Sequence, residues 1–209
     1  MLGLPSAGRV SVYYWQRLPN SERIDHDIDQ ALAEVEPAHT AERAQRTETD
    51  LLLVARDWLC PCEHKCGDPK KEPHGWRQRD WQQEDDSRLR HEYKPFFQPL
   101  LRDPSTWHDN GNRFAQLIKN LSLAVALSRR WSARGRPPEV HLGVIINERV
   151  RGKDGSTYGS EFDAFQRAVR HPEDHLHSAT WQQIRGWLGC RQEPLCRLAC
   201  RAMDENDWL

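Results

Sequence analysis

The sequence lacks any long hydrophobic run. No apolar stretch approaches the roughly 20 residues that a membrane-spanning helix needs. Its first residues show no charged segment followed by an apolar stretch, so we expect no signal peptide. Both absences favour a cytoplasmic location. In that compartment the six cysteines are expected to be thiols or metal ligands, because thiols are kept reduced there.

Apolar residues are also scarce for a chain of this length. They make up 37% of the 209 residues, against 29% charged residues, and the mean hydropathy is -0.86. A folded domain ordinarily has about 45–50% apolar residues, so part of the chain is expected to be polar and solvated. Nine tryptophans nevertheless favour a folded, aromatic-rich core, because disordered chains contain few large aromatic residues.

The chain has no strong excess of charge of either sign. Its 30 Lys and Arg residues balance 31 Asp and Glu residues, for a net charge of -1. This balance excludes a generally basic nucleic-acid coat and an acidic tail protein, but a local basic patch remains compatible with it. The best candidate for such a patch is Arg129 and Arg130, followed by Arg134 and Arg136.

Hydrophobic periodicity predicts a single α/β domain with a mixed central β-sheet flanked by helices. Apolar spacing and short apolar runs give the following elements: helices at 27–35, 113–131, 161–169 and 180–188, and strands at 51–54, 58–65 and 140–146. Residues 110–112 (Asn-Gly-Asn) are expected to cap the long helix. We expect an N-terminal extension at 1–26, a domain at 27–188 with a polar loop or insertion at 66–94, and a cysteine-containing tail at 189–209.

The two strands at 51–54 and 58–65 bring chemistry-bearing residues together. If Arg56 and Asp57 form a two-residue turn, counting outward places Asp50 opposite Glu63. Opposed side chains have Cβ atoms about 4.5–5.5 Å apart, so two carboxylates there would repel unless a cation lay between them. Lys65 lies two positions after Glu63 and therefore points to the same face of the sheet. The pattern predicts a divalent-metal site made by Asp50 and Glu63 with Lys65 beside it.

Two carboxylates and a lysine are the groups that metal-assisted phosphodiester hydrolysis requires. Carboxylates bind Mg²⁺ and leave several of its waters in place, and the ion polarises phosphate and lowers the pKa of bound water. Asp50, twelve intervening residues and then Glu63-His64-Lys65 resemble the PD-(D/E)xK nuclease superfamily. The order of the predicted elements resembles it as well, over about residues 27–150. The resemblance implies a restriction-endonuclease-like fold and a Mg²⁺- or Mn²⁺-dependent endonuclease.

The long predicted helix adds to this resemblance. In many members of the superfamily a glutamine near the start of this helix reaches into the site, which assigns that role to Gln116. Arg113 and Asn120 share its helical stripe, so the beginning of the helix is expected to face a cleft. We therefore expect Asp50, Glu63, Lys65 and Gln116 to be catalytic. Nucleic acid, DNA in preference to RNA, is expected to contact Arg113, Asn120, Arg129 and Arg130, with no membrane partner and a homodimer left open.

Other residues offer a different chemistry. Cys60, Cys62, His64 and Cys66 could bind a structural zinc ion, with Cys190, Cys196 and Cys200 as further ligands. The spacing is poor for one ion, and buried cysteines can instead act as small apolar residues. A third group, His171, His175 and His177, is interrupted by Pro172 and is expected to form a surface turn. The alternatives to a nuclease are a catalytically inactive domain of the same fold and a zinc-stabilised binding or structural module.

Overall fold

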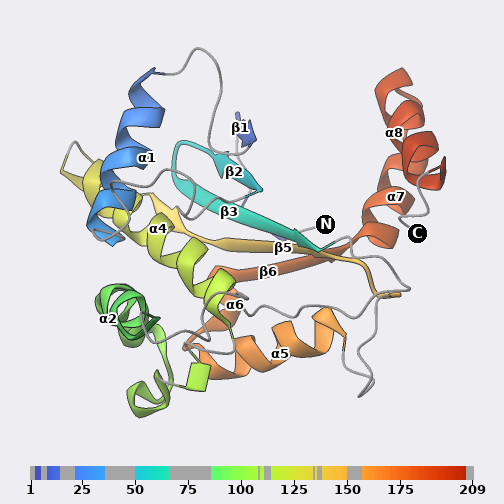
Figure 1. The fold of residues 1–209 in the computed structure, drawn as a ribbon. Coiled ribbons are helices and arrows are strands. Elements are labelled where there is room, and N and C mark those ends of the chain that lie inside the picture. The colour runs from blue at the N-terminus through green and yellow to red at the C-terminus, as the bar shows by residue number, and fades with distance from the viewer. Residues whose placement is uncertain are drawn as a thin grey trace.

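The protein is a mixed α/β fold built on a six-stranded sheet (Figure 1). The computed structural model describes residues 3–5, 9–14, 22–35, 50–65, 86–107, 109–110, 114–133, 135, 138–149 and 157–205. The strands are β1 Ser11–Tyr14, β2 Leu51–Val54, β3 Trp58–Lys65, β4 Glu139–Val140, β5 Leu142–Ile146 and β6 Leu176–Thr180. The sheet order is β1-β2-β3-β5-β6, with β4 also paired to β3.

The sheet combines antiparallel and parallel pairing. β1 and β2, and β2 and β3, are antiparallel, whereas β3 runs parallel to β4 and β5, and β5 runs parallel to β6. The carboxyl ends of β3, β5 and β6 therefore meet at one edge, where Lys65 pairs with Ile146 and Ile146 pairs with Thr180. This edge carries the candidate site.

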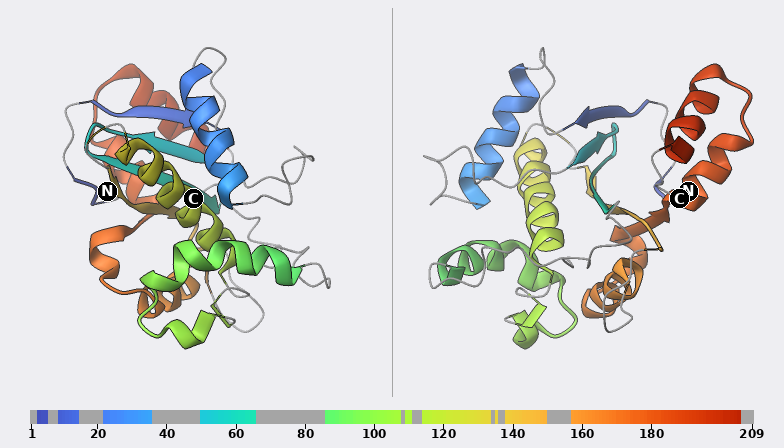
Figure 2. Two further views of the ribbon diagram at one scale, coloured as in Figure 1. Left: turned by 90° about the vertical axis from the view of Figure 1, so that its left-hand side faces the viewer. Right: turned by 45° about the vertical axis from the view of Figure 1, so that its right-hand side comes forward.

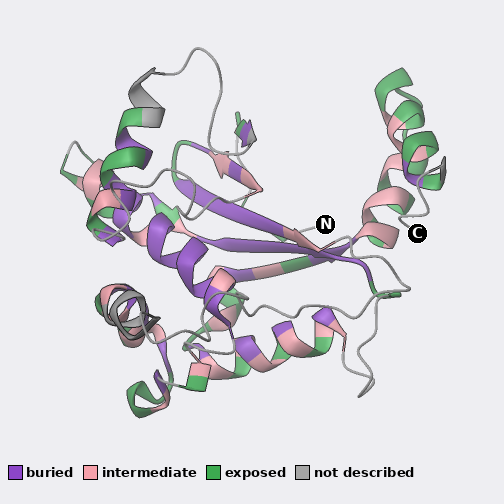
Figure 3. Cartoon of the chain, in the orientation of Figure 1, coloured by how far each residue is buried: buried purple, intermediate pink, exposed green. Residues whose placement is uncertain are grey.

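Helices cover one face of the sheet (Figure 2). They are α1 Glu22–Val35, α2 Asp86–Phe97, α4 Ala115–Ser132 and α5 Tyr158–Ala168. Between α2 and α4 lie two short 3₁₀ turns, Gln98–Leu100 and Pro104–Thr106. The largest buried cluster joins these four helices to the sheet, and Figure 3 shows that β5 is buried along its whole length.

The remaining helices follow β5 and β6. The short helix α6, Pro172–His175, leads into β6, and α7, Trp181–Gly189, follows that strand directly. α8, Pro194–Glu205, packs against α7 (Figure 1). None of the described helices is both long enough and apolar enough to cross a membrane.

Several element boundaries differ from the predictions. The strands at 51–54 and 58–65 have the predicted limits, but β1 lies in the segment taken as an N-terminal extension. Residues 86–94, taken as loop, belong to α2, because Tyr93, Phe96 and Phe97 bury one side of a helix that continues past the predicted insertion. The polar residues 66–85 lie outside the described residues. The predicted tail contains α8.

The predicted cap of the long helix is wrong for the residues described. Phe114 occupies the N-cap position of α4 and makes no side-chain capping hydrogen bond. The Asn110 side chain instead donates to the Thr106 carbonyl oxygen at 3.1 Å, and the backbone carbonyl oxygen of Asn110 accepts from the Phe114 amide at 2.9 Å. The chain therefore enters α4 through a preceding turn. Gly111 and Asn112 lie outside the described residues.

Pro61 lies inside the central strand β3 without disturbing its pairing to β2. The Ala55 amide donates to the Trp58 carbonyl, and alternation along an antiparallel pair then directs the Pro61 nitrogen away from β2. On that side the parallel pairing changes from β4, which ends opposite Leu59, to β5, which begins opposite Cys62. The missing N–H of proline thus falls at a break in the ladder, where a central strand can tolerate it.

Candidate active site

The β2–β3 hairpin has the register that the two-residue turn predicts. Leu51 pairs with Cys62, and Val54 pairs with Leu59. Extending this register by one step places Asp50, the residue immediately before β2, opposite Glu63. The sheet pleat then directs Glu63 and Lys65 toward α4, whereas Cys60 and Cys62 lie in a separate buried cluster on the opposite face.

Glu63 and Lys65 are linked to α4 by hydrogen bonds. The Lys65 ammonium donates to Glu63 Oε1 at 2.8 Å and to Gln116 Oε1 at 2.6 Å. Asn120, one helical turn after Gln116, donates from Nδ2 to Glu63 Oε2 at 3.0 Å. The structure therefore brings together three residues predicted for the site, Glu63, Lys65 and Gln116. The geometry leaves Glu63 few alternative orientations, because each of its oxygens accepts from a different partner.

His64, which lies between Glu63 and Lys65 in β3, holds the carboxylate of Asp50. Its Oδ2 accepts from the His64 backbone amide at 2.8 Å and lies 2.8 Å from His64 Nδ1. The first of these contacts joins the β3 backbone to the side chain of the residue that precedes β2. The His64 ring itself lies edge-on to Trp181 at the start of α7, 6.4 Å between centroids. Asp50 is thus held in place from the far side of the sheet.

The two carboxylates have pKa values shifted in opposite directions. Burial raises the pKa of Glu63, and the negative charge of Asp50 raises it further, while Lys65 and Asn120 oppose both effects. Burial also acts to raise the pKa of Asp50, but the side-chain and backbone hydrogen bonds from His64 and the charges of His64 and Lys65 outweigh it. The pKa of Asp50 is therefore lowered. These mutual charge effects place Asp50, Glu63 and Lys65 in one electrostatic unit.

This donor set suits a hard divalent cation. Two carboxylates supply negative charge, and an ionised carboxylate has about four lone-pair directions, so Glu63 can accept its two hydrogen bonds and still bind a cation. Burial raises the pKa of Glu63 because it disfavours the charged form, and a bound cation would favour that form. Asp50 and Glu63 could hold Mg²⁺ or Mn²⁺ at this end of the sheet.

Among the described residues predicted to contact nucleic acid, Asn120 lies apart from Arg129 and Arg130. Asn120 is 1% exposed, so its side chain faces Glu63 and not the solvent. Arg129 lies over the Phe96 ring, 4.9 Å from its centroid, and it follows Gln116 by about 20 Å along the helix axis at about 1.5 Å per residue. Arg130 is its neighbour in the last turn of α4. Arg113, Arg134 and Arg136 lie outside the described residues.

The cysteines of β3 form a close pair. Cys60 and Cys62 are buried, and their sulfur atoms lie 3.7 Å apart. The neighbouring thiol of Cys62 and burial raise the pKa of Cys60, which favours the protonated thiol. His64 directs Nδ1 to Asp50, and Cys66 lies outside the described residues. Cys190 directly follows α7, and Cys196 and Cys200 lie on α8. The described geometry fits buried thiols that act as small apolar side chains.

The predicted histidine group divides among different surroundings. His171 has a left-handed backbone, φ 47°, His175 ends α6, and His177 lies in β6, where its Nε2 is 2.9 Å from His141 Nδ1. His141 is buried between β4 and β5, and burial lowers its pKa. The hydrogen-bonded pair His141–His177 was not predicted, because nothing in the sequence pairs two residues on separate parallel strands.

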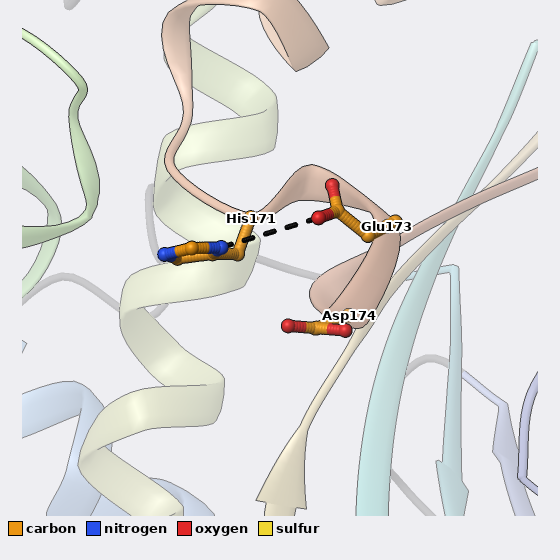
Figure 4. A group of neighbouring side chains, drawn as sticks. All are labelled: His171, Glu173 and Asp174. Atoms are coloured by element: carbon orange, nitrogen blue, oxygen red, sulfur yellow. Dashed lines mark ion pairs between the residues drawn. The ribbon is translucent and has the colours of Figure 1, made fainter.

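His171 forms a different cluster with Glu173 and Asp174 (Figure 4). Their potential ligand atoms lie within 4.8 Å of one another, which no other trio of His, Cys, Asp or Glu achieves in the described part of the chain. All three side chains are exposed. They precede β6, whose amino end pairs with the amino end of β5 at Leu142. The cluster therefore lies at the opposite edge of the sheet from Lys65.

Asn120 lies beside Glu63, whereas the sequence predicted only a contact with nucleic acid for this residue. Its spacing of four residues from Gln116 was the signal, because residues at i and i+4 lie on one helical face.

Comparisons with protein-family models, with curated proteins and with solved structures gave no significant match.

Proposed function

We propose that this protein is a metal-dependent nuclease that hydrolyses DNA phosphodiester bonds. The observation that carries the proposal is the hydrogen-bonded group Glu63, Lys65 and Gln116 with Asp50 opposite Glu63 in register. Residues from a hairpin and from a helix more than 50 positions away converge there on one lysine ammonium. The mixed sheet and the order of its elements support a restriction-endonuclease-like fold as part of this proposal.

Each residue then has a distinct task. Asp50 and Glu63 hold the divalent cation, which when bound supplies polarisation of the phosphate and a lower pKa for a coordinated water. The Lys65 ammonium orients the attacking water and stabilises negative charge that develops on the phosphate. Gln116 accepts a hydrogen bond from Lys65 and so fixes the direction of the ammonium. His64 fixes Asp50 through two contacts to a single oxygen, which leaves Oδ1 for the cation.

The proposal is tested by cleavage of plasmid DNA with Mg²⁺ or Mn²⁺. Wild-type protein is expected to nick or cut the plasmid, and Glu63→Gln and Lys65→Met are expected to reduce the rate by at least about a hundredfold, the usual scale for losing an electrostatic or acid–base group. Glu173→Gln is the matched control, because its carboxylate is exposed and lies at the opposite edge of the sheet.

A negative result has a defined meaning. If wild-type protein that retains its fold cleaves no DNA with any divalent metal, the nuclease proposal fails and the inactive domain of this fold takes its place. A labelled RNA substrate run beside the plasmid decides between the two nucleic acids. Metal analysis of protein purified without chelator tests the zinc alternative, which requires about one zinc per chain and unfolding on chelation.

A further inference from the structure

Asn120 is a polar side chain in a position where a helix ordinarily buries an apolar one. It is 1% exposed, and both its neighbours in α4, Lys119 and Leu121, are also buried. Its Nδ2 donates to Glu63 Oε2 at 3.0 Å. Because an ionised carboxylate only accepts hydrogen bonds, this contact fixes which end of the amide faces Glu63. The amide oxygen Oδ1 must then be turned away from Glu63 Oε2.

That oxygen has no hydrogen-bond partner among the described residues, although it is fully shielded from solvent. A buried polar atom without a partner costs about 1–3 kcal/mol, so such atoms are rare in folded proteins and call for an explanation. The two amide atoms of Asn120 share one carbon, so the unpartnered oxygen is necessarily next to the carboxylate proposed to hold a cation. Amide carbonyl oxygens are ordinary ligands of hard divalent cations.

We propose that Asn120 is a third oxygen donor of the cation site, with Oδ1 coordinating the ion that Asp50 and Glu63 bind. This inference rests on the proposed function and adds a ligand from α4 to the two from the hairpin. The same side chain then serves both purposes, since Nδ2 orients Glu63 while Oδ1 contacts the cation. A helix-borne ligand also explains why this polar residue is tolerated at a buried position in the second turn of α4.

The competing explanation is structural. In that case Asn120 only ties α4 to β3 through Glu63, and its oxygen has no role. Two variants whose side chains have the same number of heavy atoms as asparagine, branched at the same carbon, separate these explanations. Asn120→Leu removes both amide atoms, whereas Asn120→Asp removes the donor to Glu63 but places a charged oxygen where Oδ1 lies. A structural tie is lost in both variants, whereas a cation ligand is lost only in the leucine variant.

The experiment is a titration of the metal-free full chain with Mn²⁺, following the electron paramagnetic resonance signal of the free ion. We expect Asn120→Leu to weaken Mn²⁺ binding by about tenfold, the lower end of what neighbouring hydrogen-bond partners of metal ligands contribute. Asn120→Asp should bind Mn²⁺ at least as tightly as wild type. Ser122→Ala, a buried polar position on the same helix, is the control and should bind like wild type.

Two results overturn the inference. The first is that Asn120→Leu binds Mn²⁺ as tightly as wild type. The second is that Asn120→Asp loses as much Mn²⁺ affinity as Asn120→Leu does. Circular dichroism establishes that each variant is folded, and if Asn120→Leu does not fold, the direction of the change in Asn120→Asp decides alone. If the wild-type protein binds no Mn²⁺, the proposed function fails with the inference. If wild type binds Mn²⁺ and cleaves DNA while the variants behave as in the overturning results, only the inference fails.

Discussion

At the residue scale, Asp50 and Glu63 show how two carboxylates in one site can have different acidities. Both are largely buried, and burial alone raises the pKa of each. Asp50 accepts two hydrogen bonds from His64 on one oxygen, which more than compensates for its burial. Glu63 has Lys65 as its cationic partner, but the nearby charge of Asp50 adds to its burial. Hydrogen bonding to the charged form of Asp50 therefore moves the pKa values of the two groups apart.

This difference predicts opposite effects of pH on the stability of two variants. Glu63 has a raised pKa, so ionising it costs folding free energy, and the cost appears as the pH rises through its folded pKa. Glu63→Gln, which cannot ionise, should therefore gain stability relative to wild type as the pH rises from 4 to 7.5. Urea unfolding of metal-free protein at both pH values measures the difference.

Asp50→Asn should show the reverse dependence. The pKa of Asp50 is lowered, so its ionised form stabilises the fold at pH values above the ordinary value of 3.8, and this contribution is lost as the pH falls through the folded pKa. The asparagine variant should be less stable than wild type at pH 7.5 and approach it on acidification. A pH-independent difference for either variant would contradict the assignment of these shifts.

At the element scale, the approach of β3 to β5 depends on a glycine. A Cβ atom built on Gly143 would lie 2.7 Å from Cys62 Sγ and 3.3 Å from Cys60 Sγ. Real Cβ atoms essentially never come so close as the first distance, so one of these groups must move if the glycine is replaced. The two parallel strands at the centre of the sheet therefore fit together only because one of them has no side chain at this position.

Gly143→Ala is accordingly expected to destabilise the protein by about 1–3 kcal/mol, the usual cost of overpacking a core. Cys62→Ala removes the closer sulfur, so the double variant should recover part of the loss. The coupling energy of this double-mutant cycle, measured by chemical denaturation, should be at least about 0.5 kcal/mol. Purely additive losses would show that the strands separate at this point without a clash.

Two predicted elements differ from the structure, the polar segment that contains the start of α2 and the single strand at 140–146. The sequence segment 66–94 is polar on average, and this concealed helix α2. The buried residues of α2, which are Tyr93, Phe96 and Phe97, lie close to residue 94 or after it, so they add little apolar character to the segment. The run 140–146 reads as one strand, but His141 separates β4 from β5 because its side chain turns to His177 while its amide donates to Leu59. Local patterns cannot report such contacts between distant strands.

At the scale of the whole molecule, stability is unevenly distributed. α4 and β5 contribute many of the buried side chains of the main core, while Trp58, Cys60 and Cys62 of β3 form a second buried cluster. α8 lies at the far end of α7 (Figure 3), and among its residues 194–204 only Met203 is buried, while Leu195 and Leu198 are exposed. Its contact with the rest of the described chain is mainly with α7, including the Arg185–Asp204 ion pair.

We therefore expect hydrogen exchange to divide the molecule into two parts. Amides of α8 should exchange through local opening, faster than those of β3 and α4, whose exchange should require unfolding of the core. Mass spectrometry of peptides covering Pro194–Glu205 and Trp58–Lys65 measures both in one experiment. Equal protection of the two segments would show that α8 belongs to the core unit. The folded domain would then extend past residue 189, where we expected the tail to begin.

The sequence by itself determined the hairpin: its strand limits, its register and the common face of Glu63 and Lys65 follow from a two-residue turn and the pleat, which are local rules. Helical spacing likewise placed Gln116 and Asn120 on one side of α4. Only the tertiary structure decided that this side meets Glu63, that Asn120 is buried there, and that His64 binds Asp50. The reason is physical, because these contacts depend on how α4 packs across the sheet, and packing joins residues that no local pattern relates.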